Sequence, residues 1–488
     1  MPILHADQFR HYVERFNAME PEGVVNLISN AGAWEWMAGN VPLFACPDST
    51  IEEIYYFRWW SFRKHIKQTP AGLIVTEFIE PVRHAGTFNS ISCATGHHLA
   101  EGRWLRDQSF LDEYTRFWFR SNEGKPEYRF HRYSSWIEAA MYERYLVTGD
   151  KAILLDLFDD LIADYAAWEN EKLGPDGLFW QFDVWDGMEE SITGSRKHKN
   201  ARPTINSYMY ANALAIAAIA TMAGKDEIAL AFREKASSLK RLVHERLWDS
   251  GAKFFKAQKD EDGLSDAREE IGFIPWCFNL PEAGCEEAWG QLIDPQGFWA
   301  PFGITTAERR HAKFRSHGVG KCEWDGAVWP FATSQTLGAL AKVLRGYQQR
   351  FVNRGHYLEA MRTYARCHQM NGRPYIGEYL DEKSGEWLKG DNPRSRYYNH
   401  STFADLVIGG LVGIVPREDD TIEIDPLLPE QSWDWFCLDG VRYHGRDVAI
   451  LWDRDGKKFG RDAGLSVFAG NRRIAHSTTL SRVMGTIT

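Results

Sequence analysis

A repeated pattern of paired helices, joined by long polar loops, restricts the possible folds of this sequence more than any other feature. Helical periodicity predicts such pairs over residues 135–168, 207–247 and 329–368, each turning at a short segment that contains glycine. Helical hairpins that stack in this way collect their long loops at one end, where function usually resides. We therefore expect a mainly α fold, an (α/α)6 toroid of six helix pairs. An open helical solenoid is the alternative.

The pattern of apolar and polar side chains changes after Pro416, and this change divides the chain into two predicted parts. Residues 1–416 would form the helical barrel, with an irregular N-terminal segment that contains a helix at 51–66 and a strand at 73–79. Residues 417–488 alternate apolar and polar side chains and contain Asp-Gly turns, as short strands joined by tight turns do. We expect this second part to be a small β-rich appendage, packed on the barrel and without a function of its own.

The composition excludes several classes of function. A net charge of −10 argues against a nucleic-acid surface, and no apolar run is long enough to span a membrane. Seven scattered cysteines form no CxxC pair, so we expect neither a zinc ribbon nor a disulfide framework, and no cofactor. The first residues lack the pattern of a signal peptide, which favours the cytoplasm. The 20 Trp, 19 Tyr and 28 Phe suit both a large core and stacking against sugar rings.

Two loops combine acidic side chains with aromatic residues and glycine, at Val184–Glu190 and Gly377–Glu386. A pair of carboxyl groups is the minimum equipment for cleaving a glycosidic bond, because one protonates the leaving oxygen and the other activates water or attacks the sugar. We assign Asp186 as the acid and Glu378 as the base. Within the same two loops, the alternatives are Glu189 as the acid and Glu386 as the base. Surface acids in loops are common, so the pairing depends on geometry.

The motifs resemble those of inverting (α/α)6 glycosidases of the trehalase type, in glycoside hydrolase families 37 and 63, together with the mannosylglycerate hydrolases. Trp185-Asp186-Gly187, followed by Ile205–Tyr210, is similar to the segment that carries the general acid in those families. Glu323–Pro330 resembles the Trp-rich loop of their sugar site. Glu378–Glu386 resembles the stretch with the general base, and Trp104–Asp107 resembles a Trp-x-Arg-Asp motif that grips the terminal sugar.

The sequence also departs from these families. Where trehalases carry Glu-x-Tyr-Tyr-Trp-Asp, residues 53–58 end in Arg58 instead of Asp. The acid loop lacks the usual Asn-Ser-Pro-Arg and reads Gly-Met-Glu-Glu-Ser at residues 187–191. These departures argue against trehalose and mannosylglycerate as substrates. The layout is also similar to the broader mannosylglycerate hydrolase-like domain, which includes the β-L-arabinofuranosidases of family 142.

The resemblance implies an exo-acting, inverting glycosidase that removes a terminal sugar from an oligosaccharide or a glycoside. Inversion requires the two carboxyl groups to lie ~6.5–9.5 Å apart, so that a water molecule fits between them. Several side chains would hold the hydroxyl groups of the sugar or form the walls of its pocket, although each Trp is equally suited to the hydrophobic core. They are Arg58, Trp59, Trp104, Arg106, Asp107, Trp185, Trp324, Asp325, Trp329, Tyr379 and His400.

Two other classes of protein fit the same fold. A sugar epimerase or polysaccharide lyase would place His97, His98 or His400 at the centre of the site, with Asp186 remote. A non-catalytic glycan-binding protein would stack sugars on tryptophan but would lack a facing carboxylate pair. The adjacent pair His97-His98 has no partner at helical zinc spacing, so no metal site is expected.

Overall fold

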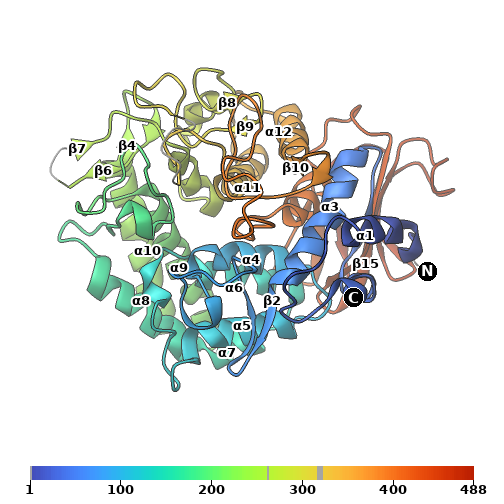
Figure 1. The fold of residues 1–488 in the computed structure, drawn as a ribbon, viewed down its shortest axis with the longest axis horizontal. Coiled ribbons are helices and arrows are strands. Elements are labelled where there is room, and N and C mark those ends of the chain that lie inside the picture. Colours follow the sequence, from blue (N-terminus) through green and yellow to red (C-terminus); the bar gives the residue numbers. More distant parts are fainter. Residues whose placement is uncertain (1–2, 261–262, 316–321, 488) are drawn as a thin grey trace.

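The computed structural model describes residues 3–260, 263–315 and 322–487 and shows a mainly α chain with a β-rich C-terminal region (Figure 1). Six segments form an inner ring, each packed against the next. They are α4 (Thr95–Gly102), α6 (Ile137–Thr148), α9 (Pro203–Met222), the 3-10 helix η8 (Glu270–Phe278), α11 (Pro330–Gly346) and the π-helical segment η10 (Leu406–Val412).

The ring closes between its first and last segments. The buried carboxylate of Glu101, on α4, accepts hydrogen bonds from the backbone N–H groups of Phe403, Ala404 and Asp405, which lead into η10. An open solenoid would leave these two ends apart, so the chain forms a toroid as predicted. Because Glu101 bonds to the first free N–H groups of η10, it also satisfies donors that would otherwise be unpaired in the core.

An outer layer supplies one partner for each inner segment. It consists of α3 (Ser49–Phe62), α5 (Ser109–Arg120), α8 (Phe158–Lys172), α10 (Asp226–Leu247), the short η9 (Glu286–Gly290) and α12 (Arg354–Cys367). The outer α10 buries one stripe of small and apolar side chains at helical spacing, whereas the inner α9 is buried on most of its surface. The three predicted helix pairs are therefore α6 with α8, α9 with α10, and α11 with α12. This part of the prediction is confirmed.

The C-terminal region builds two antiparallel sheets beside the ring (Figure 1). The larger has the order β1-β14-β15-β16-β17, so β1 (Leu43–Ala45), from the N-terminal part of the chain, is its edge strand. The smaller sheet has the order β12-β13-β18. The remaining bounds are β12 (Ile414–Val415), β13 (Thr421–Ile424), β14 (Trp435–Tyr443), β15 (Arg446–Asp453), β16 (Gly464–Ala469), β17 (Arg472–Ser477) and β18 (Val483–Thr486).

Smaller elements fill the remaining positions. Helices α1 (Arg10–Asn17), α2 (Ala33–Asn40) and α7 (Ala152–Asp156) flank the outer layer. Short hairpins join β2 (Ile66–Thr69) to β3 (Gly72–Val75), β4 (Trp248–Asp249) to β5 (Phe254–Phe255), β6 (Gln258–Lys259) to β7 (Gly263–Leu264), β8 (Trp299–Ala300) to β9 (Gly303–Ile304), and β10 (Gln369–Met370) to β11 (Arg373–Pro374). Among the described residues, none of the helices is both long and apolar enough to cross a bilayer.

The two ends of the ring are different. The loops that precede the inner helices meet at one end, around a pocket that contains Glu189 and Glu378. The C-terminal halves of α4, α6 and α11 line a separate cavity at the other end, near the C-terminal sheets. The direction of the inner helices therefore decides which loops can reach each end.

Candidate active site

A pocket at the loop end of the ring is lined by carboxyl groups, aromatic rings and two thiols. Its residues come from the segment after β3 and from the loops that precede α4, α6, α9, α11 and η10. They are Glu77, Phe78, His84, Ile91, Cys93, Tyr133, Gly187, Glu189, Cys322, Trp324, Trp329, Phe331, Glu378, Arg394, Tyr398 and His400. Glu378, Trp324, Trp329 and His400 were expected at the site from the sequence, and the structure brings these four together.

Glu378 is held firmly at the edge of this pocket. Its side chain is only 2% exposed, and Oε1 accepts a hydrogen bond of 2.6 Å from the buried hydroxyl of Ser395. The Arg394 guanidinium lies 3.8 Å from the same oxygen. Two backbone hydrogen bonds of 3.0 Å between Val328 and Leu380 fasten the Glu378 loop to the Trp329 loop. The carboxyl group is thus oriented by a hydroxyl and accompanied by a cation.

Glu189 supplies a second carboxyl group to the loop-end pocket. It comes from the acidic loop Val184–Glu190, which the sequence predicted to carry an acid. Its backbone carbonyl accepts a hydrogen bond from the Trp324 N–H at 3.3 Å, which joins the loop before α9 to the loop before α11. Burial raises the pKa of Glu189 to about 7, and the negative charges of Asp183 and Glu378 add to this effect. A carboxyl group with this pKa keeps its proton at mildly acidic pH, as a general acid must.

Asp186 lies outside the pocket lining. It is 2% exposed, and its Oδ2 accepts a 2.7 Å hydrogen bond from Nε of the fully buried Arg202 as well as one from the Thr204 hydroxyl. Both partners belong to the start of α9, where Arg202 directly precedes Pro203. Asp186 therefore forms a buried ion pair that fixes the acidic loop to the helix behind it. The next residue, Gly187, lines the pocket, whereas Asp186 itself is not among the lining residues.

Trp324 and Trp329 line the pocket and belong to a stack of three aromatic rings, whose third member, Tyr379, is not among the lining residues. The rings of Trp324 and Trp329 lie 4.3 Å apart at 20°, and Trp329 stacks on Tyr379 at 4.7 Å and 14°. The Trp329 indole N–H donates to the Glu323 carbonyl, whereas the Trp324 Nε1 has no hydrogen-bond partner in the described part of the chain. Trp324 therefore offers both an apolar face and a free donor to a ligand in the pocket.

His400 lines the pocket next to Tyr398, with ring centroids 3.7 Å apart. Neither ring nitrogen of His400 finds a partner among the residues that the structure describes. Burial and the neighbouring charge on Arg58 keep the pKa of His400 well below its usual value, so the ring is neutral. His400 can donate a hydrogen bond to a ligand or accept one from it. Because its ring is neutral, it does not act as a general acid at neutral pH.

The other expected sugar-binding residues do not line this pocket. Arg58 is buried behind it and donates to the Ser401 carbonyl at 2.5 Å. Trp59 and Trp104 are core side chains, and the Trp104 indole donates to Asp405 at 2.6 Å. Both rings pack in the hydrophobic core of the barrel, which was the alternative to sugar binding for each Trp.

Arg106 and Asp107 lie beyond the C-terminal end of α4, at the end of the ring away from the pocket. Arg106 forms a 2.9 Å ion pair with Asp447 of the C-terminal sheet, and Asp107 accepts hydrogen bonds from Ser109 at the start of α5. The direction of α4 accounts for this placement, because only the segment before α4 faces the pocket.

Two further expected site residues, Trp185 and Asp325, have partners within the protein. The Lys172 ammonium lies 4.6 Å from the centroid of the Trp185 ring. The Asp325 carboxylate forms an ion pair with Arg315. Glu386, the alternative base, is exposed and lies outside the pocket lining. Glu378 is thus the only one of the two proposed bases that lines the pocket.

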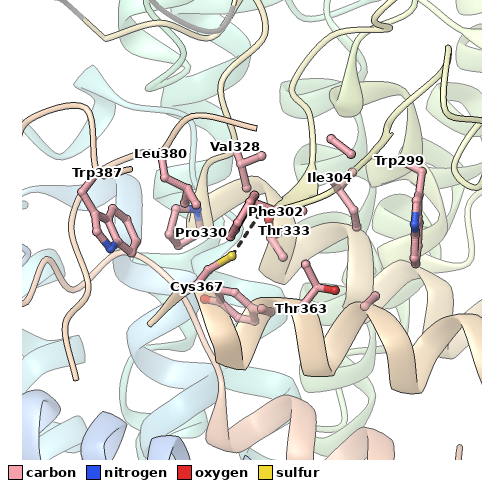
Figure 2. Close-up of a pocket in the computed structure, with 14 residues that line it drawn as sticks. Trp299, Phe302, Ile304, Val328, Pro330, Thr333, Thr363, Cys367, Leu380 and Trp387 are labelled. Atoms are coloured by element: carbon pink, nitrogen blue, oxygen red, sulfur yellow. Dashed lines mark hydrogen bonds between the residues drawn. The ribbon is translucent and has the colours of Figure 1, made fainter. Parts of the chain in front are cut away.

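An apolar cavity lies behind the wall that carries Trp329 and Tyr379. Figure 2 shows it lined by side chains including Trp299, Phe302 and Trp387, with the Cys367 thiol donating to the Phe302 carbonyl at 3.1 Å. It contains none of the carboxyl groups of the pocket at the loop end. Its lining suits the packing of the Val328 and Leu380 loops better than a reaction that needs proton transfer.

The sequence did not single out Glu77, Arg394, Ser395 or Cys93 as site residues. Glu77 follows a short strand, and nothing in its neighbourhood of sequence marks it as facing the carboxyl pair. Arg394 and Ser395 lie in a polar loop that precedes His400. Their positions in the chain could have located all four, because each lies in a segment that leads into an inner helix or follows β3.

Together, the toroid and a pocket with two carboxyl groups beside stacked tryptophans define a glycoside hydrolase of the (α/α)6 class. Residues 87–401 match the family described as the mannosylglycerate hydrolase MGH1-like glycoside hydrolase domain, and the chain belongs to this family. Residues 416–475 match the C-terminal domain of glycosyl hydrolase family 65.

Solved structures place the chain among glycosidases. It is similar to a protein named "Sialidase", with 50% sequence identity and a TM-score of 0.97; the match covers 99% of this chain and 45% of that one. The present chain thus spans less than half of that relative's length. The GH63 mannosylglycerate hydrolase from Thermus thermophilus, solved with glucose, is 12% identical with a TM-score of 0.55, and the match covers 72% of this chain and 98% of that one.

A GH78 family rhamnosidase of Bacillus sp. GL1 has the same fold, with 13% identity and a TM-score of 0.62 over 85% of this chain and 40% of its own. At these identities the two distant structures establish the shared fold alone.

Proposed function

We propose that this chain is an exo-acting, inverting glycoside hydrolase in which Glu189 is the general acid and Glu378 the general base. The observation that carries the proposal is the presence of both carboxyl groups in one pocket, together with the raised pKa of Glu189. The assignment of Asp186 as the acid remains an untested prediction. Arg202 and Thr204 hold its Oδ2, whereas its buried Oδ1 has no hydrogen-bond partner among the described residues. Glu189, the alternative within the same loop, lines the pocket and Asp186 does not, so we favour Glu189.

The proposed reaction uses both carboxyl groups. Glu378, oriented by Ser395, would accept a proton from a water molecule as that water attacks the anomeric carbon. Glu189 would give its proton to the glycosidic oxygen as the bond to the leaving group breaks. The water attacks the face opposite to the leaving group, so the released sugar has inverted configuration.

We infer action on a chain end from the resemblance of the sequence motifs to those of exo-acting glycosidases. The pocket lining includes Trp324, Trp329, Phe331, Phe78 and Tyr398, aromatic side chains on which a terminal sugar can stack.

The experiment is a screen of aryl glycosides followed by NMR of the first-formed anomer. The panel contains α-D-mannosides and α-L-rhamnosides, because two structural neighbours carry those activities in their names, with sialosides for the third. It also contains β-L-arabinofuranosides, which the sequence resemblance favours. Release of the inverted anomer supports the proposal, and release of the retained anomer overturns it.

Variants Glu189→Ala and Glu378→Ala should each abolish hydrolysis while the thermal melting temperature is kept. Full activity in either would reject that residue's role. Because His400 lines the pocket, a sugar epimerase or lyase is the second candidate, and the same NMR spectra would show an epimerised or unsaturated sugar in place of hydrolysis.

A further inference from the structure

The segment after β3 carries a third carboxyl group into the pocket, on Glu77. Its backbone is clamped to the loop that leads to His400, because the Asn399 N–H donates to the Glu77 carbonyl at 3.0 Å and the Asn399 side chain donates to Thr76. Glu77 is 5% exposed, so it belongs to the wall of the pocket and not to its rim.

One oxygen of Glu77 is already used within the protein. The Tyr398 hydroxyl donates a short hydrogen bond to Oε1. Tyr398 follows Tyr397, whose backbone has a φ of +57°, a strained conformation for a bulky residue. The Tyr397 carbonyl contacts Nε2 of the buried His65 at 2.7 Å, so the surrounding structure holds this strained turn and directs Tyr398 toward Glu77.

The other oxygen of Glu77 is not used. Oε2 is buried and has no hydrogen-bond partner among the residues that the structure describes. A buried polar oxygen without a partner is unfavourable, so such atoms usually meet a ligand or a water molecule. Here the atom belongs to a residue that lines the same pocket as Glu189 and Glu378.

We propose that Glu77, held by Tyr398, is a substrate-binding residue that hydrogen-bonds through Oε2 to a hydroxyl group of the sugar bound between Glu189 and Glu378. This inference rests on the proposed function for the position of the sugar. It gives Glu77 a role separate from proton transfer in the reaction, which the other two carboxyl groups complete without it.

The chemistry of Glu77 fits this role. Burial raises its pKa to about 8, with smaller contributions from the charges of Glu378 and Glu189. The group is therefore mostly protonated at neutral pH. With Tyr398 donating to one oxygen, the neutral acid can donate its proton to a sugar hydroxyl, which is both a donor and an acceptor. A neutral group also avoids placing a third negative charge beside the pair.

The test compares Glu77→Ala with Glu77→Gln, which keeps the shape and a hydrogen-bonding group. Exposed Glu80 provides the matched control, as Glu80→Ala. Binding of D-mannose, L-rhamnose and L-arabinose is measured by tryptophan fluorescence, since Trp324 and Trp329 line the pocket. We expect the affinity of the sugar that binds wild-type protein to fall by about tenfold or more in Glu77→Ala, and by less in Glu77→Gln.

A deoxy series identifies the hydroxyl group. For the bound sugar, removing the hydroxyl that meets Glu77 should weaken binding to the wild-type protein but cost nothing further in Glu77→Ala, because the two changes remove one interaction. Tyr398→Phe keeps the ring and removes the donor, so it should lower affinity in the same direction if Glu77→Ala fails to fold.

Equal affinities of wild-type protein, Glu77→Ala and Tyr398→Phe for all three sugars, including no measurable binding to any of them, would overturn the inference. The binding measurement needs no turnover. Sugar binding that depends on Glu77, without any hydrolysis, would therefore reject the proposed function and support this inference. Hydrolysis that is unchanged in Glu77→Ala would support the proposed function and reject this inference.

Discussion

Glu189 and Glu378 line one pocket, and the negative charge of Glu378 contributes to raising the pKa of Glu189 to about 7. The two groups are therefore coupled before any substrate binds. Like charges that share a buried site cannot both ionise easily, so one of them keeps a proton. The raised pKa of Glu189 makes it the group that we expect to hold the proton, and Glu378 has Ser395 and Arg394 as partners.

This coupling predicts the basic limb of the pH profile. Glu189 must be protonated to act as an acid, and its raised pKa means that the protonated form dominates below about pH 7. We expect kcat/KM to fall by about tenfold per pH unit above that value, because the acid is progressively lost. Kinetics on an aryl glycoside across about pH 5–9 measure this.

The same coupling can be tested by NMR. Glu378→Gln removes a negative neighbour, so it should lower the pKa of Glu189 observed by carbon NMR of labelled carboxyl groups. A basic limb that lies well below pH 7, or a Glu189 pKa that is unchanged in Glu378→Gln, would contradict this account.

The identity of the acid can be tested with leaving groups of different basicity. Glu189→Gln should lower kcat by about 10²–10⁴-fold on a substrate with a poor leaving group, because the departing oxygen then lacks a proton. On a 2,4-dinitrophenyl glycoside the loss should be much smaller, since that group leaves without protonation. Asp186→Asn is the matched control and should show no such dependence on the leaving group. The opposite pattern would assign the acid to Asp186.

Asp186 should matter for stability instead. Its partner Arg202 is fully buried, and Asp186→Asn would remove the ion pair of that guanidinium, leaving only the neighbouring charges of Glu269 and Asp183. Removing one partner of a buried pair costs about 3–5 kcal/mol, which urea denaturation measures as a lower midpoint. The exposed pair of Arg10 with Glu14 offers a control, because Glu14→Gln should change stability by less than about 1 kcal/mol. Equal effects of the two variants would refute the structural role.

Much of the ring could be predicted from the sequence because helical periodicity is a local property. The pairs α6 with α8 and α9 with α10 follow from apolar spacing and from turns such as Gly149. The edge strand β1 was not expected, since its pairing with β14 joins residues far apart in the chain. Long-range pairing of a three-residue strand leaves almost no local pattern.

The site was predicted in part for the same reason. Glu378 and Trp329 lie in loops that lead into inner helices, so locating the loops located the residues. Within the acidic loop, the sequence motif favoured Asp186 as the acid, with Glu189 as the alternative, and that choice stays a prediction. The hydrogen bond from Arg202 to Asp186 could not be predicted, because no local pattern in the sequence marks that pairing. Trp104 carried a family-like motif but follows the C-terminal end of α4, which faces away from the pocket.

The position of Glu189 depends on a backbone turn that only glycine allows at Gly187. Its φ is +73°, and an added Cβ would lie 2.4 Å from the Cys93 sulfur, which lines the pocket. Gly187→Ala should therefore displace the loop and reduce kcat/KM by about tenfold or more, because small shifts of an acid are costly. Gly224 is the matched control, with a φ of +68° and no atom within 4 Å of an added Cβ.

Gly224→Ala should lose about 1 kcal/mol of stability through backbone strain alone and keep full kcat/KM. Adding Cys93→Ala to Gly187→Ala removes the clash but leaves the strain, so activity should return in part. Cys93→Ala alone should have little effect, because the thiol takes no part in the proposed chemistry. If Gly187→Ala kept wild-type kcat/KM while its thermal melting temperature fell no further than that of Gly224→Ala, the turn at Gly187 would not be what positions Glu189.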